Sequence, residues 1–279
     1  LQRSSNDDVA SMNKLAAVPA EIHQHILESY HERPVQAELV EKLLLSGSHS
    51  NSSSCVLVHG MGGTGKTVTA VAAVQDNAVR LWYNQIYWLT VGADAVGDTI
   101  KQLQAILLKR MTGIAPKEKN EYEQQQMLIE AIAEKQRALV VLDDPWMPEQ
   151  VRFLNPIDGS QTKGHRLLVT TRIRDLVPKA VRVELPLMGK DEAVALLLDL
   201  AKVEKASYLK QYPGAEWPPA AAYEISAECG LLPMTLTIAA QVVRSWGHGW
   251  SDHVLPLLRE QQSSGNRSGA STAEERVIG

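Results

Sequence analysis

The sequence of 279 residues has only two cysteines, Cys55 and Cys229, which lie far apart and in apolar surroundings. A disulfide framework needs more cysteines, so this pair indicates buried, reduced thiols in a cytoplasmic protein. No apolar run approaches the roughly 20 residues that a membrane-spanning helix needs. The polar stretch at residues 1–8 is unlike a signal peptide. We therefore expect a cytoplasmic protein with no membrane partner.

Neither sign of charge dominates, since 28 Lys and Arg face 32 Asp and Glu for a net charge of −4. This balance gives no support to nucleic-acid binding through bulk charge, and we expect no such partner. His248 and His253 have no cysteine or carboxylate cluster around them that would make them metal ligands. Their Gly and Trp neighbours favour a loop and a packing helix instead. The sequence lacks an initiator methionine, which we interpret as the sign of a piece of a longer chain.

Apolar residues, by contrast, are plentiful: 44% of the chain is hydrophobic, enough for one large or two modest domains. From residue 55 onward, short continuous apolar runs alternate with helical segments. This alternation predicts an α/β domain, a parallel sheet with helices on both faces. We expect strands at residues 55–59, 86–91, 138–142, 166–171 and 180–185, and helices at residues 34–45, 68–74, 99–111 and 121–136.

After residue 187 the strand-like runs stop. Residues 190–201, 219–229 and 233–246 have helical patterns, with a loop expected at residues 208–218 because it holds Pro213, Gly214 and Pro218. A small all-helical subdomain is therefore expected to follow the sheet. The serine-rich stretch at residues 45–54 predicts a loop before the first strand.

The most specific pattern is G-x-x-x-x-G-K-[ST], which residues 60–67 fill completely between a predicted strand and a predicted helix. Glycines let the backbone N–H groups turn inward around a β-phosphate, and the positive end of the next helix points at the same anion. Lys66 is expected to reach the β- and γ-phosphates, and the Thr67 hydroxyl to hold Mg²⁺. The expected nucleotide-binding residues of this segment are Gly60, Met61, Gly62, Gly63, Thr64, Gly65, Lys66, Thr67 and Val68.

An acidic pair, Asp143 and Asp144, ends the strand predicted at residues 138–142. In phosphate-loop proteins a carboxylate at this place binds Mg²⁺ through water, opposite the hydroxyl of the loop, which here is that of Thr67. Asp144 is the candidate for polarising an attacking water. The alternative is an ordinary acidic turn after a strand.

Arg172 directly follows the next predicted strand. The carboxyl ends of parallel strands face the ligand crevice of an open sheet, so Arg172 is placed to read a terminal phosphate. Two alternatives stay open: Arg172 as a solvated charge at the start of a loop, and Arg174 as the phosphate reader.

In this order the motifs resemble the NB-ARC family of nucleotide-binding switches, part of the signal-transduction NTPases that include apoptosome and plant disease-resistance proteins. The resemblance covers about residues 30–260. Besides the phosphate loop, it rests on Ile86-Tyr87-Trp88-Leu89-Thr90-Val91, Leu142-Asp143-Asp144-Pro145-Trp146, Leu168-Val169-Thr170-Thr171-Arg172 and Gly230-Leu231-Leu232-Pro233-Met234. The last motif has one leucine more than the family's usual Gly-Leu-Pro-Leu.

The resemblance implies a P-loop NTPase fold, a three-layer sandwich around a mostly parallel five-stranded sheet. Residues 1–30 are then a lead-in, residues 31–188 the nucleotide-binding domain, residues 189–260 the first ARC-type helical subdomain, and residues 261–279 a mobile tail. The family's winged-helix domain, with its histidine toward the β-phosphate of ADP, is expected outside this sequence.

The resemblance also implies ADP or ATP with Mg²⁺ as ligands. Arg172 then senses the γ-phosphate, Pro233 lies against the nucleotide and Arg33 sits beside the adenine. Asp144 stands where fast ATPases have Glu, which implies at most a slow Mg²⁺-dependent ATPase. Self-assembly on activation and effector and sensor domains elsewhere in a longer chain are further implications.

Two functions from different classes remain: a regulatory switch with slow turnover, or an active enzyme, either a kinase or an ATP-driven motor of related fold. The phosphate loop is common to both. No acceptor site of a kinase and no arginine finger of a motor stands out in the sequence, so the switch is the preferred interpretation.

Overall fold

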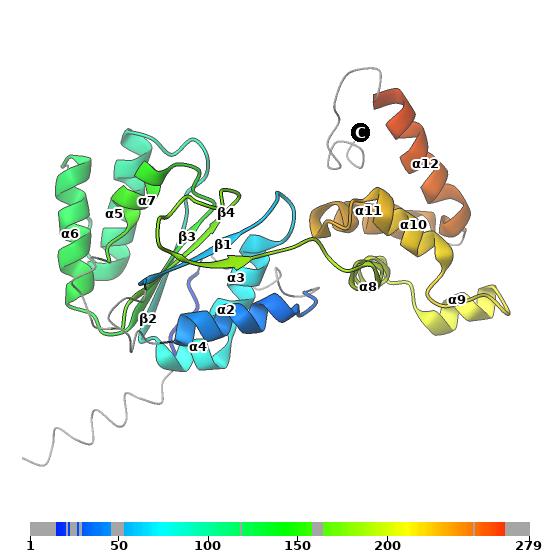
Figure 1. The fold of residues 1–279 in the computed structure, drawn as a ribbon, viewed down its shortest axis with the longest axis horizontal. Coiled ribbons are helices and arrows are strands. Elements are labelled where there is room, and N and C mark those ends of the chain that lie inside the picture. The colour runs from blue at the N-terminus through cyan, green and yellow to red at the C-terminus, as the bar shows by residue number, and fades with distance from the viewer. Residues whose placement is uncertain are drawn as a thin grey trace, which may run out of the picture. The chain divides into compact units, whose positions relative to one another are not determined.

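In the computed structural model, the five predicted strands form one parallel sheet (Figure 1). Their order is β2-β3-β4-β1-β5, and every neighbouring pair is parallel. Continuous apolar runs form these strands because both faces of the sheet are covered. The strands are β1 (Cys55–His59), β2 (Gln85–Thr90), β3 (Ala138–Asp143), β4 (Arg166–Thr171) and β5 (Val181–Glu184).

The structure describes residues 15–20, 22, 27, 30–45, 53–117, 119–157, 164–247 and 249–265. Most of the expected lead-in and serine-rich loop, together with His248 and residues 266–279, lie outside them. The chain divides into two units, one of Leu1–Gly60 with Lys66–Leu185 and one of Met61–Gly65 with Pro186–Gly279.

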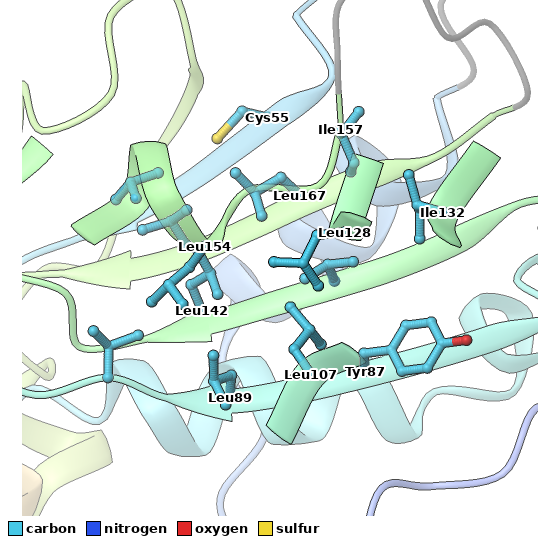
Figure 2. Close-up of a cluster of buried hydrophobic side chains, with 14 of the residues drawn as sticks. Cys55, Tyr87, Leu89, Leu107, Leu128, Ile132, Leu142, Leu154, Ile157 and Leu167 are labelled. Atoms are coloured by element: carbon cyan, nitrogen blue, oxygen red, sulfur yellow. The ribbon is translucent and has the colours of Figure 1, made fainter. Parts of the chain in front are cut away.

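Three helices cover one face of the sheet: α5 (Asp98–Thr112), α6 (Glu121–Ala133) and α7 (Pro148–Leu154). Leu107, Leu128 and Leu154, one from each helix, are fully buried against Leu142 and its neighbours (Figure 2). Full burial of one such side chain stabilises the fold by about 1.5–3 kcal/mol. The short α7 was not among the predicted helices.

The other face is covered by α2 (Pro34–Leu44), α3 (Lys66–Gln75) and α4 (Asn77–Trp82), of which α4 was not predicted. Leu139 and Val141 of β3 pack on this side, while Val140 and Leu142 pack on the opposite side. This alternation is the period of a strand between two layers. The expected three-layer α/β sandwich is confirmed.

The second unit is helical, with a separate core that includes Leu197, Ile225, Leu236 and Val254. Its helices are α8 (Lys190–Leu200), α9 (Lys205–Gln211), α10 (Ala220–Glu228), α11 (Pro233–Trp246) and α12 (Trp250–Gly265). The expected helical subdomain is therefore present, and α12 is the packing helix expected around His253, whose ring stacks on Trp246.

The predicted loop at residues 208–218 is wrong at its start, because α9 continues to Gln211. No residue of α9 is fully buried, so an apolar period could not have revealed it. Tyr208 packs on Trp217 and Trp250, with ring centroids 5.7 and 6.3 Å apart, and fixes the helix to the core. At the other end of the unit, α12 runs on to residue 265, beyond the point where the tail was expected to begin.

Candidate functional site

The segment that fills the phosphate-loop pattern connects β1 to α3, as expected. Gly63 and Gly65 have φ values of +74° and +92°, in the left-handed region that glycine enters without strain. The Thr64 hydroxyl donates a 2.9 Å hydrogen bond to the Met61 carbonyl and braces the turn. The first N–H groups of a helix have no partner within it, so the start of α3, where Val68 lies, can donate to an anion.

Lys66, the first residue of α3, is only 8% exposed, and its ammonium group donates to the Gly60 carbonyl at 3.0 Å. Burial lowers the pKa of Lys66, and the positive charge of Arg172 lowers it further. An anion bound beside Lys66 would favour its charged form and so oppose both effects. The site is thus electrostatically suited to a phosphate group.

Asp143 is the centre of a hydrogen-bond network between neighbouring elements. Its Oδ1 accepts from the Thr67 hydroxyl at 2.9 Å and from the Thr170 hydroxyl at 2.6 Å. Burial raises the pKa of Asp143, and these two donors partly offset the rise. A hydroxyl and a carboxylate are hard oxygen ligands of the kind that Mg²⁺ prefers, so the pair Thr67 and Asp143 fits that ion.

The role of Thr170 was missed, although its motif had been noted. Thr170 lies beside Asp143 in the parallel register of β3 and β4. A hydroxyl residue at the end of the strand next to a candidate metal carboxylate was the available signal. Strand order, which the sequence does not give, is what makes the two residues neighbours.

Asp144 follows β3 in a left-handed conformation, with φ of +57°. Its backbone N–H donates to both oxygens of Thr170, at 3.0 Å to the carbonyl and 3.1 Å to the hydroxyl. Its carboxylate Oδ2 accepts a 3.1 Å hydrogen bond from the indole Nε1 of Trp146. The two acidic side chains thus have different partners: Asp143 binds hydroxyl groups and Asp144 binds an indole.

Arg172 is exposed at the end of β4, and its guanidinium carbon lies 5.0 Å from the centre of the Trp146 ring. Its charge acts on Lys66, as described above. Arg174 is also exposed, and its carbonyl accepts a hydrogen bond of 3.4 Å from Arg182. Of the two candidates, Arg172 is the one that contacts the segment carrying the acidic pair.

Gln150 supports this segment and was also missed. It is 1% exposed, and its side-chain oxygen accepts from the backbone N–H groups of Trp146 at 2.6 Å and Met147 at 3.0 Å. Its amide nitrogen donates at 3.0–3.3 Å to three carbonyl groups after β2, those of Gly92, Ala93 and Ala95. One buried side chain therefore fixes the loop after β3 to the loop after β2.

Pro233 begins α11, and its Cγ would lie 3.8 Å from a Cβ added to Gly65. The next backbone N–H, of Met234, donates to the Gly63 carbonyl at 3.3 Å. Before them, Gly230 and Leu231 both have left-handed φ values, +64° and +55°. The extra leucine of this motif is thus accommodated in a tight turn, and Pro233 lies against the phosphate loop.

Arg33 is the N-cap residue of α2 and is 6% exposed. Helix α2 covers the same face of the sheet as α3, so Arg33 belongs to the same layer as the helix that follows the phosphate loop. Among the described residues, no helix is long and apolar enough to cross a membrane.

Residues 35–207 match the NB-ARC domain. The chain belongs to the NB-ARC family. It is therefore a nucleotide-binding domain of the P-loop NTPase fold and of the signal-transduction class, as its motifs predicted.

Two curated relatives of the NB-ARC chain are apoptotic protease-activating factor 1 of Danio rerio and disease resistance protein ADR1 of Arabidopsis thaliana. The first is 26% identical over 241 residues, which are 82% of this chain and 18% of that protein. The second is 27% identical over 205 residues, 72% of this chain and 22% of that protein. The chain thus spans about a fifth of the length of these relatives.

A solved structure, that of C. elegans PCH-2, has a TM-score of 0.53 to this chain at 16% identity. The likeness covers 86% of this chain and 72% of that one. At this identity the likeness concerns the fold alone.

Proposed function

We propose that this NB-ARC domain is the ADP/ATP switch of a larger signalling protein, in which the bound nucleotide controls conformation and assembly and hydrolysis is slow. The observation that carries the proposal is the network around Asp143. It joins the helix after the phosphate loop, through Thr67, to the end of β4, through Thr170. A ligand that engages Thr67 and Asp143 is therefore coupled to the strand that leads to Arg172.

The residues present support binding of a nucleotide with Mg²⁺. Thr67 and Asp143 would hold the ion, Asp143 through water, and the ion would neutralise phosphate charge. Lys66 would exchange its bond to the Gly60 carbonyl for the β- and γ-phosphates, gaining a charge-assisted contact. Arg33 beside the adenine and Pro233 against the nucleotide complete the proposed site.

The difference between ADP and ATP is assigned to Arg172. A γ-phosphate offers the guanidinium a partner that ADP does not have. A contact made with only one of two ligands shifts a conformational equilibrium by its differential affinity and no more. Arg172 is thus the residue through which the domain would distinguish its two nucleotide states.

Slow hydrolysis is supported by the environment of Asp144, the group proposed to polarise the attacking water. The indole N–H of Trp146 binds its carboxylate. An oxygen that already accepts from an indole N–H has less capacity left to accept from an attacking water. We therefore expect turnover well below the enzyme median of about 10 per second.

The names of the relatives, an apoptotic protease-activating factor and a disease resistance protein, support a signalling context. We extend the proposal to a cytoplasmic protein that self-assembles on activation and carries effector and sensor domains, with no nucleic-acid or membrane partner. Residues 31–188 would bind the nucleotide, and residues 189–260 would form the first ARC-type subdomain that responds to it.

The first test is the ligand retained by gently purified protein, released by heat and separated by ion exchange. Adenine nucleotide, in particular ADP, is expected. Guanine nucleotide that adenine nucleotide cannot displace would contradict the proposal.

The second test is the thermal shift given by ADP and by a non-hydrolysable ATP analogue. A ligand at about 100 times its Kd adds roughly 2.7 kcal/mol of stability. Arg172→Ala should keep the increment from ADP and lose much of that from the analogue, while the control Arg174→Ala should keep both. If Arg172→Ala lost the stability increments from ADP and from the analogue equally, Arg172 would not be the sensor. An ATP turnover rate at or above the enzyme median would favour the alternative functions, a motor or a kinase.

A further inference from the structure

Trp146 contacts two residues with proposed roles beyond nucleotide binding: Asp144, which would polarise the attacking water, and Arg172, which would sense the γ-phosphate. Its indole Nε1 donates to Asp144 Oδ2 at 3.1 Å, and its ring lies under the guanidinium of Arg172 at 5.0 Å. One side chain thus links the end of β3 to the end of β4. Nothing in the proposed function so far requires the ring to contact Arg172.

The ring is held in place from two directions. The backbone N–H of Trp146 donates to the buried side chain of Gln150 at 2.6 Å, and the indole N–H is fixed by Asp144. Asp144 is itself held to Thr170 through its backbone. A ring fixed at its backbone and at its polar edge presents its face in one orientation.

Electrostatic repulsion opposes the position of the Arg172 guanidinium over the Trp146 ring. Its side chain is exposed, and Arg172 and Lys66 carry charge of the same sign. Repulsion between the two cations would drive a free guanidinium into solvent. The negative face of an indole attracts a cation and opposes that movement.

Contact with the ring does not prevent Arg172 from binding phosphate. The attraction of a ring acts on the charge of the guanidinium, whereas its N–H donors lie in the plane of the group. An arginine over an indole can therefore still donate to an anion at its edge. Ring and phosphate are compatible partners.

We propose that Trp146 is a positioning residue for Arg172: its ring holds the guanidinium at the end of β4, ready for a γ-phosphate, and its bond to Asp144 fixes the ring. This inference rests on the proposed sensing role of Arg172. A side chain ordered before binding loses less conformational freedom when the triphosphate arrives. ADP has no γ-phosphate, so its affinity does not depend on the ring.

The test is titration calorimetry of Trp146→Leu and Trp146→Phe with Mg²⁺ and either ADP or a non-hydrolysable ATP analogue. A cation–π contact at an exposed site corresponds to a factor of about two to five in affinity. Trp146→Leu should weaken the analogue by this factor and leave ADP unchanged. Trp146→Phe keeps a ring but loses the N–H donor, so its loss should be smaller.

Trp82→Leu is the matched control, because Arg137 lies over the Trp82 ring at 5.2 Å. Arg137 precedes β3, whereas Asp144 follows it, so this second pair lies at the opposite end of the strand. Trp82→Leu should leave the ratio of the two affinities unchanged. A change as large as that of Trp146→Leu would mean that the ratio reports general damage, and the inference would be wrong.

A double-mutant cycle separates this inference from the proposed function. In an Arg172→Ala background, Trp146→Leu should have no further effect on the ratio. The same loss with and without Arg172, or equal loss of ADP and analogue, would overturn the positioning role while leaving the switch intact. If Arg172→Ala alone left the ratio unchanged, the sensing role and this inference would both fall.

Discussion

The two ends of the parallel sheet both carry polar side chains, but these side chains bind different kinds of partner. At the amino end of β3 and β4, Arg166, the first residue of β4, donates to the carbonyl groups of Ser53 and Leu45. His165, just before β4, accepts from the backbone N–H of Ala138. At the carboxyl end of the same strands, some side chains also bind carbonyl groups, as Gln150 and Thr171 do. Others bind one another, as in the network of Thr67, Asp143 and Thr170 and in the contacts of Trp146 described above.

This difference separates structural polar groups from functional ones. A side chain that satisfies a backbone carbonyl group cannot be released without leaving that group unpaired, which is costly when it is buried. Side chains that bind one another can exchange partners when a ligand arrives with donors and acceptors of its own. We therefore expect substitutions at the amino end to change stability, and substitutions of the carboxyl-end side chains that bind one another to change nucleotide binding.

The largest effect is expected for Arg166→Met, which keeps the aliphatic stem of a side chain that is 7% exposed. It removes hydrogen bonds from a charged donor to two carbonyl groups and should lower the free energy of unfolding by about 3 kcal/mol. Chemical denaturation measures the loss. The control is Arg182→Met, whose ion pair with Asp175 is exposed and should be worth at most about 1 kcal/mol. If both variants lowered the free energy of unfolding equally, the bonds of Arg166 to backbone carbonyl groups would be no more stabilising than an exposed ion pair.

Lys66→Ala should differ from Arg166→Met by weakening nucleotide binding more than it lowers the stability of the protein. It removes a charge-assisted contact to the phosphates and should weaken nucleotide binding by about 1.5–3 kcal/mol, as measured by titration calorimetry. The ligand-free protein should lose only about 0.5–1.5 kcal/mol of stability, because the bond to the Gly60 carbonyl is lost while burial already disfavours the charged ammonium. Wild-type affinity in this variant would mean that the loop is not the nucleotide site.

The adjacent residues Thr170 and Thr171 make the comparison within one strand. Thr170 donates to the Asp143 carboxylate at 2.6 Å, whereas Thr171 donates to the Pro145 carbonyl at 2.8 Å. Replacing either by Val should cost about 0.5–1.5 kcal/mol of stability for one lost hydrogen bond. Only Thr170→Val should also reduce the gain in nucleotide affinity that Mg²⁺ provides. If Thr170→Val and Thr171→Val reduced the Mg²⁺-dependent gain in affinity equally, the kind of hydrogen-bond partner, side chain or backbone carbonyl, would not distinguish site residues from structural ones.

Local patterns were enough to predict the sheet and most of its helices. β4 has the bounds expected from its apolar run, and α3 follows the phosphate loop as its motif requires. α4 and α7 were missed because helices this short show no clear apolar period. Each carries few buried residues, and packing on the sheet supplies the rest of its stability.

The candidate site was predictable where a motif fixes chemistry and position together, as for Lys66 and Asp143. Gln150 and Trp146 were not predictable, because each also has a partner outside its own loop whose proximity depends on strand order. These partners are the carbonyl groups after β2 for Gln150 and Arg172 for Trp146. A polar residue seven positions after Asp143 reads as a surface residue in the sequence, yet Gln150 is buried. Long-range hydrogen bonds of this kind have no periodic signature.

The smallest expected effect is that of nucleotide on the amino end of the sheet, where the reaction rate of the Cys55 thiol at the start of β1 should not change. Burial raises the pKa of this thiol to about 12, from an ordinary value of 9.0, and also raises that of Cys229 to about 12. Only the thiolate is nucleophilic, so at pH 8 both thiols should react with a disulfide reagent about a thousandfold more slowly than an ordinary thiol. Both should react at once in denaturant.

Single variants Cys229→Ser and Cys55→Ser allow each thiol to be followed alone, with Cys229 in the helical unit as the reference. Saturating nucleotide should leave the rate at Cys55 unchanged, because the amino end of the sheet takes no part in binding. Arg166→Met removes the positive charge that lowers the pKa of Cys55, so it should slow the reaction of Cys55 further and leave that of Cys229 unchanged. A nucleotide-dependent rate at Cys55 would show that the two ends are coupled, and the division between a structural and a functional end would no longer hold.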